Sequence, residues 1–139
     1  MRGDTGYEMK EVSVLGTKDA IATIAVKNIA TARKFYEGTL GLKLVDAGEP
    51  EAPVYQSGSS RVMVYQSRYA GTNKATAATW PVGNDLEKIV QALKAKGVAF
   101  EHYDDLPETT RKGDVHVTGR LKLAWLKDPD GNILALFGE

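Results

Sequence analysis

The stretch IATIAVKN, residues 21–28, decides the fold, because it joins a short apolar run to a helix start. Ile21 to Val26 is short and rich in β-branched residues, which is typical of a buried strand. Asn28 can cap a helix, and Gly41 stands where a left-handed residue ends one. We therefore predict a helix to about Thr39, with an apolar face of Ile29, Ala32, Tyr36 and Leu40.

The same pattern returns as AATWPVGN, residues 77–84. Here Asn84 is expected to cap the helix with Glu87 as its capping-box partner, and Gly97 is expected to end it. Four pairs of identical residues lie 56 positions apart at matching strand, cap and helix-stop positions: Thr23 and Thr79, Val26 and Val82, Asn28 and Asn84, and Gly41 and Gly97. This register indicates a duplicated module.

Each module is expected to continue with three strands, giving the order βαβββ twice. The predicted strands are residues 42–45, 54–57 and 61–66 in the first module, and 100–103, 122–127 and 133–137 in the second. Asp128 to Asn132 is predicted to be a turn, and 104–121 a long polar loop. The predicted fold class is α+β, with two tandem βαβββ modules forming a curved mixed sheet around a cavity.

The predicted domain organisation is a leader over residues 1–18 followed by one domain over 19–139. The first module covers about 20–67 and the second about 75–138. The segment Tyr69 to Thr76 between them could close over a ligand through Thr72 and Asn73, or it could simply satisfy its own backbone. Trp80 is expected to pack between sheet and helix, because adjacent strand residues point to opposite faces and Thr79 is expected on the other face.

Composition excludes several classes of protein. The chain has 139 residues, no Cys, and 18 Lys and Arg against 18 Asp and Glu. The absence of Cys excludes disulfide scaffolds and thiolate metal sites, and the balanced charge argues against a nucleic-acid partner. No apolar stretch approaches the length of a membrane span, so we expect no membrane partner and a cytoplasmic protein.

Two motifs resemble the vicinal oxygen chelate superfamily of glyoxalases, bleomycin- and fosfomycin-resistance proteins and extradiol dioxygenases. The first runs from IAVKN, residues 24–28, through Phe35-Tyr36 to Leu40-Gly41-Leu42, and the second is WLKDPDGN, residues 125–132. The resemblance implies a curved sheet around a cavity and, as in many members, a homodimer. It also implies a metal that chelates vicinal oxygens of a substrate.

The positions that the resemblance assigns to metal ligands are apolar in this chain. They are Ile21, Ala77 and Ala135, with a further ligand of some members falling at about Met63. Divalent ions of this kind need imidazole or carboxylate donors. We therefore expect no metal at this position and no cofactor, which puts glyoxalase, thiol-transferase and extradiol dioxygenase chemistry in doubt.

Strand alternation predicts which side chains share the inward face with those four positions. The result is a largely apolar and aromatic cup that suits a flat hydrophobic or aromatic molecule. The first hypothesis is therefore metal-independent binding of such a small molecule, in resistance or sequestration; the alternative is that the side chains fill the space. The candidate ligand-binding residues are Thr23, Arg61, Met63, Tyr65, Thr79, Leu123, Trp125 and Phe137.

The second hypothesis is an enzyme. His102 and His116 are the only histidines, and each has carboxylates nearby in sequence that could orient its ring. With Tyr65 they are the candidate catalytic residues of a glyoxalase-like lyase, isomerase or dioxygenase, working without metal or with displaced metal ligands. The sequence leaves open whether the protein is an enzyme.

Overall fold

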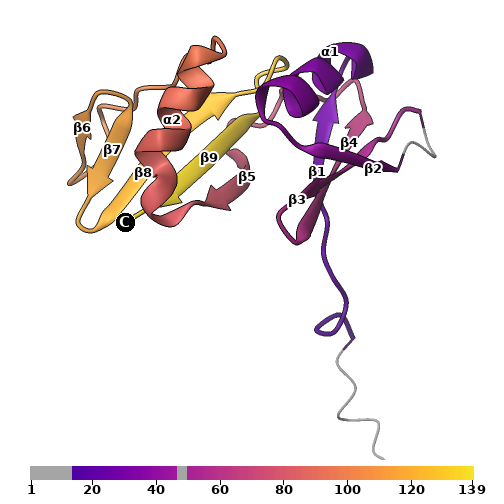
Figure 1. Cartoon of the computed structure of the whole chain (residues 1–139), viewed down its shortest axis with the longest axis horizontal. Helices are drawn as coiled ribbons and strands as arrows, with labels where there is room; N and C mark the ends of the chain where they lie inside the picture. Colours follow the sequence, from indigo (N-terminus) through magenta and orange to yellow (C-terminus); the bar gives the residue numbers. More distant parts are fainter. Residues whose placement is uncertain (1–13, 47–49) are drawn as a thin grey trace, which may run out of the picture.

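The protein is described here from a computed structural model, which covers residues 14–46 and 50–139. Most of the expected leader, residues 1–13, lies outside the described residues. The first module consists of β1 (Ala22–Val26), α1 (Ile29–Arg33), a π-helical continuation (Lys34–Thr39), β2 (Lys43–Asp46), β3 (Val54–Ser57) and β4 (Ser60–Gln66) (Figure 1). Its order βαβββ agrees with the sequence prediction.

The second module lies beside the first in Figure 1. It consists of β5 (Thr76–Pro81), a 3₁₀ turn (Gly83–Asp85), α2 (Leu86–Ala95), β6 (Thr110–Lys112), β7 (Val115–Thr118), β8 (Leu121–Lys127) and β9 (Ile133–Gly138). It therefore has one strand more after its helix than the first module.

The strands of the described residues form two mixed sheets, one per module, with the orders β1-β4-β3-β2 and β5-β9-β8-β7-β6. In each module the first strand pairs in parallel with the last, and the remaining pairs are antiparallel. These sheets with their helices confirm the α+β fold class.

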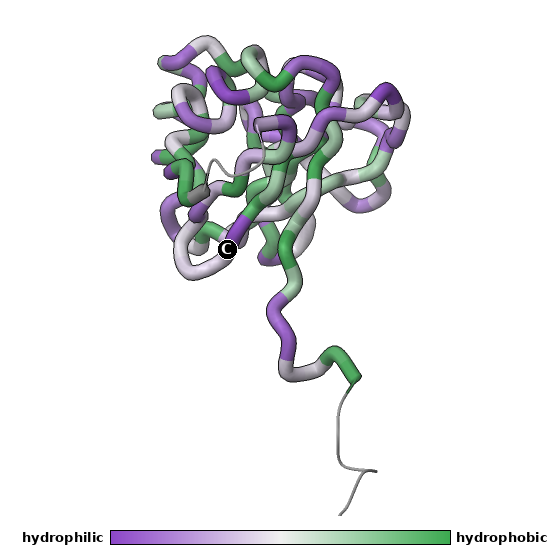
Figure 2. Tube along the Cα trace, turned by 90° about the vertical axis from the view of Figure 1, so that its right-hand side faces the viewer, coloured by the Kyte–Doolittle hydropathy of each residue, from purple (hydrophilic) through white to green (hydrophobic). Residues whose placement is uncertain are grey.

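Each sheet buries one face against the helix of its own module. Ile24 and Val64 are fully buried in the first module, as are Leu126 and Leu134 in the second. Hydrophobic and hydrophilic segments alternate along the chain trace in Figure 2. Side chains two positions apart share a face, so residues of the opposite parity point away from the helices.

Several local predictions are wrong in detail. Asn84 does not cap α2, because the positive φ of Gly83 starts a 3₁₀ turn that contains Asn84. The N-cap is Asp85, which makes no side-chain capping bond, so the capping box is absent. The expected strand over 100–103 is reduced to one bridge, from Glu101 to Trp125. The expected loop over 104–121 contains the β6–β7 hairpin.

The turn over 128–132 is confirmed, and it also joins the two modules. Asp128 N–H donates to the Asn132 carbonyl at 2.9 Å to close the turn. The buried Tyr36 hydroxyl of the first module donates to Asp128 Oδ2 at 2.8 Å. Asn132 Nδ2 donates to the Ala25 carbonyl at 2.7 Å, and Lys27 N–H donates to Asp130 Oδ2 at 3.1 Å. We call this contact between the 128–132 turn and the first module the inter-module clamp.

Candidate functional site

The open faces of the two sheets, which point away from the helices, carry the predicted cup residues. In the first sheet Thr23 lies opposite Met63. In the second, Leu123 lies opposite Phe137, and Trp125 lies opposite Ala135. Of the eight candidates, Met63, Leu123, Trp125 and Phe137 are half-buried, and Thr23, Arg61, Tyr65 and Thr79 are exposed. The candidates are thus distributed over two separate sheets.

Only some candidates border the same hollow. Trp125 lines a cavity of about 730 Å³ on the second sheet, which we call the Trp125 cavity. Arg61 and Thr79 line a separate cavity of about 480 Å³ where the two modules meet. The other five candidates do not line either of these two cavities.

The Trp125 cavity has an aromatic wall. The rings of Tyr103 and Trp125 meet edge to face, with centroids 5.2 Å apart. Glu101 N–H donates to the Trp125 carbonyl at 2.8 Å, which ties the segment before Tyr103 to β8. The pKa of Tyr103 is raised by burial and by the nearby Glu101 carboxylate, so its hydroxyl stays protonated at neutral pH.

The sequence pointed to Trp125 but not to most of its neighbours in this cavity. Lys127 and Ile133 could have been found, since they share strand parity with Trp125 and Ala135. Tyr103 and Leu106 come from an irregular segment, where alternation predicts nothing. The remaining lining residues are Gly71, Asn73, Lys74, Ala75, Thr76 and Gly131.

The linker between the modules makes local hydrogen bonds and also borders the Trp125 cavity. Thr72 Oγ1 donates to the Tyr69 carbonyl at 2.7 Å, and Asn73 Oδ1 accepts from Ala75 N–H at 2.9 Å, so the linker satisfies its own backbone. It nevertheless borders the Trp125 cavity through Gly71 and through residues 73–76.

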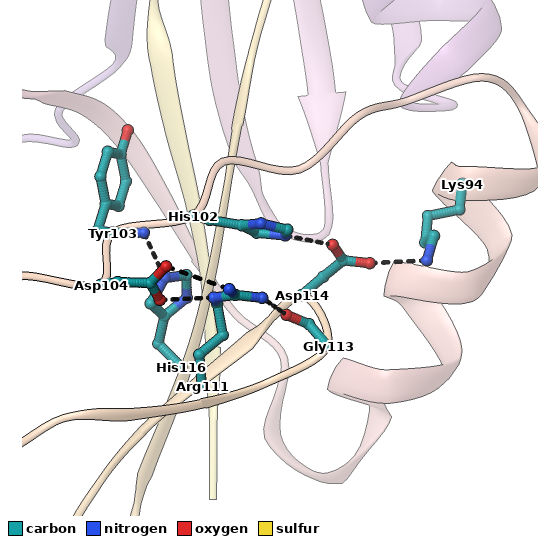
Figure 3. A network of polar contacts seen from close by, with 8 residues as sticks. All are labelled: Lys94, His102, Tyr103, Asp104, Arg111, Gly113, Asp114 and His116. Atoms are coloured by element: carbon teal, nitrogen blue, oxygen red, sulfur yellow. Dashed lines mark hydrogen bonds and ion pairs between the residues drawn. The ribbon is translucent and has the colours of Figure 1, made fainter.

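His116 lies behind the aromatic wall. Its ring contacts Trp125 with centroids 4.8 Å apart, and the residue is fully buried. Tyr103 N–H donates to His116 Nε2 at 2.9 Å, so a neutral ring carries its proton on Nδ1 (Figure 3). Nδ1 is buried without a partner at hydrogen-bonding geometry. Burial lowers the pKa of His116, although the Leu123 backbone opposes the shift, so the ring is neutral at neutral pH.

His102 belongs to a surface network rather than to the aromatic wall. Its Nε2 lies 2.9 Å from Asp114 Oδ1, and Lys94 Nζ on α2 lies 2.8 Å from Asp114 Oδ2 (Figure 3). Lys94 and His102 together lower the pKa of the Asp114 carboxyl. Arg111 on β6 makes a two-pronged contact to Asp104, at 2.7 and 3.1 Å. These contacts hold the segment before β6 against the hairpin.

The structure does not bring the three predicted catalytic residues together. Tyr65 is an exposed residue of β4 in the first sheet, whereas His116 is a residue of β7 in the second and His102 precedes that sheet's hairpin. None of the hydrogen bonds or ring contacts between described residues joins Tyr65 to either histidine.

A third cavity, of about 260 Å³, lies on the helix side between the modules. Trp80 lines it together with Ile89 and Leu93 of α2, as expected for a side chain between sheet and helix. Trp80 Nε1 donates to Ser57 Oγ of the first module at 2.8 Å. Trp80 also lines the cavity of about 480 Å³ but does not line the Trp125 cavity, so the two tryptophans of the chain border no common cavity among these three.

The residues at the expected metal position do not fit a metal. Ile21, Met63, Ala77 and Ala135 supply no imidazole or carboxylate donor. Within residues 14–46 and 50–139, no group of three or more His, Cys, Asp or Glu side chains could hold an ion.

Comparison with known protein families shows which family the chain belongs to. The sequence profile of the Glyoxalase/Bleomycin resistance protein/Dioxygenase superfamily matches residues 19–136. The chain belongs to this superfamily. It is a member that lacks the usual metal ligands. No curated protein matches the chain.

Several solved structures share the fold of this chain. An integron cassette protein from the mobile metagenome of the Halifax Harbour sewage outfall has a TM-score of 0.65 at 17% identity, covering 88% of this chain and 99% of its own. The fosfomycin resistance protein FosX from Listeria monocytogenes has a TM-score of 0.65 at 10% identity, covering 87% and 92%. An integron cassette protein from Vibrio cholerae has a TM-score of 0.58 at 19% identity, covering 86% and 94%.

No helix in the described part of the chain is long and apolar enough to cross a membrane.

Proposed function

We propose that the protein binds a small apolar or aromatic molecule, without a metal, in the Trp125 cavity. The observation that carries this proposal is a hollow of about 730 Å³ walled by the paired rings of Tyr103 and Trp125. Ligand pockets of roughly 300–1,000 Å³ with mainly apolar and aromatic linings are typical of small-molecule sites. A flat ligand gains stacking and burial on these rings.

The role of such binding is proposed to be sequestration of, or resistance to, the bound compound. FosX, which shares the fold, is a fosfomycin resistance protein. We favour binding over catalysis because His116 is fully buried behind Trp125, and His102 and Tyr65 lie outside the lining of the cavity. A general acid or base must come within hydrogen-bonding reach of the proton it transfers.

We further propose that the protein is a homodimer. The open face of the first sheet exposes Val45 by 41% and Tyr65 by 39%, and Ile21 just before β1 is exposed by 46%. Burying such a face against a second copy would remove apolar surface from water. Sedimentation equilibrium should give about twice the 15.1 kDa chain mass; a single-chain mass at all concentrations would reject the dimer.

Isothermal titration with 2-naphthamide, a neutral flat aromatic probe, tests the binding function. One probe per chain is expected to bind the wild type, and Trp125→Leu should weaken binding by about tenfold or more, because stacking and ring burial are both lost. Trp80→Phe is the matched control, since Trp80 does not line the Trp125 cavity. Equal affinity of wild type and Trp125→Leu would overturn the proposal.

A further inference from the structure

Each polar side chain that lines the Trp125 cavity can donate a hydrogen bond; these side chains are Asn73, Lys74, Thr76, Tyr103 and Lys127. Lys74 and Lys127 contribute ammonium groups, and Tyr103 contributes a protonated phenol. Asn73 uses its Oδ1 to accept from Ala75 N–H, which leaves its amide NH₂ as a donor. Neither Asp nor Glu is among the residues that line this cavity.

The residues that line the cavity include two lysines and no acidic side chain. Lys74 makes no ion pair within the described part of the chain. Lys127 Nζ lies 3.6 Å from Glu101 Oε1, which is too long for a hydrogen bond and leaves its donors available. Among the described residues, the carboxylate that pairs with a lining lysine is that of Glu101, which lies outside the lining.

The lysines and other donors of the lining distinguish cationic, neutral and anionic aromatic ligands, all of which could stack on the aromatic wall. A cationic ligand would meet two lysines and no carboxylate among the lining residues. A neutral aromatic would leave the lysines in water. A planar carboxylate accepts from ammonium and amide donors while its ring stays on the aromatic wall.

We propose, resting on the binding function proposed above, that the ligand is an aromatic carboxylate, with its ring against Trp125 and Tyr103 and its carboxylate at Lys74 and Lys127. Lys74 comes from the linker between the modules and Lys127 from the end of β8. The two elements thus supply the anion-binding side of one site, and the linker acts as a specificity element for the charge of the ligand.

The test compares 2-naphthoate with 2-naphthamide, which share the ring and differ in charge. Isothermal titration of the wild type is expected to give about tenfold tighter binding of the naphthoate, and this preference should shrink as salt screens the lysines. Lys74→Gln and Lys127→Gln should each weaken naphthoate binding severalfold and naphthamide binding much less, so that the preference for naphthoate shrinks. Glu101→Gln should strengthen naphthoate binding.

Lys88→Gln is the matched control, because Lys88 is an exposed lysine of α2 that does not line the cavity. Equal affinities for the two probes, with both lost in Trp125→Leu, would overturn the carboxylate proposal and leave the binding function intact. A loss of naphthoate preference in Lys88→Gln as large as in Lys74→Gln would overturn it too, since the preference would then reflect net charge alone. Binding of neither probe would overturn both proposals.

Discussion

The inter-module clamp makes a quantitative prediction for Tyr36→Phe. The Tyr36 hydroxyl is fully buried and donates to Asp128 Oδ2, and Asp128 is itself only 4% exposed. Hydrogen bonds to charged groups contribute about 1.5–3 kcal/mol, and removing one partner also strips a buried acceptor of a donor. Asp128 keeps its bonds from Asn132 Nδ2 and from two backbone N–H groups, which limits the loss. We expect a loss of about 2 kcal/mol.

Equilibrium unfolding in urea, followed by circular dichroism, measures this loss directly. For 139 residues, 2 kcal/mol corresponds to a fall in melting temperature of about 7 °C. Tyr55→Phe is the matched control, because its hydroxyl donates to Glu37, whose side chain is 32% exposed and can turn to water. A Tyr36→Phe protein within 0.5 kcal/mol or so of wild type, or one no less stable than Tyr55→Phe, would refute the reasoning.

Two further predictions concern stability. Gly71→Ala should lower the melting temperature more than Gly58→Ala does. Both glycines have positive φ, but a Cβ at 71 would clash with the Asp130 carbonyl oxygen, whereas at 58 nothing lies within 4 Å. Because burial lowers the pKa of His116, the folded state binds fewer protons than the unfolded one, so stability should fall as pH drops below about 6.5. In His116→Gln the free energy of unfolding should depend less on pH between about pH 7.5 and 5.5. An unchanged pH dependence would show that other groups cause the loss of stability.

The modules and most of their elements could be predicted because their signals are local. The apolar run over 21–26 predicts a strand from its own residues alone, and the structure has β1 there. Gly41 and Gly97 likewise predict local helix ends, and both have positive φ. The repeat then predicted the first strand, the helix and the last two strands of the second module, but not its β6–β7 hairpin.

What the sequence could not predict depends on contacts between distant residues. Tyr36 and Asp128 were noticed separately, as a helix residue and a turn residue, but nothing local indicates that they meet across 92 positions. The β6–β7 hairpin was missed because its strands have only three and four residues, and β6 is polar. Strand parity placed Trp125 on the open face, while the position of Tyr103 depends on an irregular segment tied down by a single bridge.

The central claim, that an aromatic molecule binds beside Trp125, is tested most directly by the two tryptophan indole signals in a ¹H–¹⁵N correlation spectrum. The chain has two tryptophans, and each borders a different cavity. Trp125→Phe assigns the signals. On titration with 2-naphthoate, the Trp125 indole signal is expected to shift to saturation while the Trp80 signal stays in place. A shift of Trp80 alone, or of neither signal, would contradict the account.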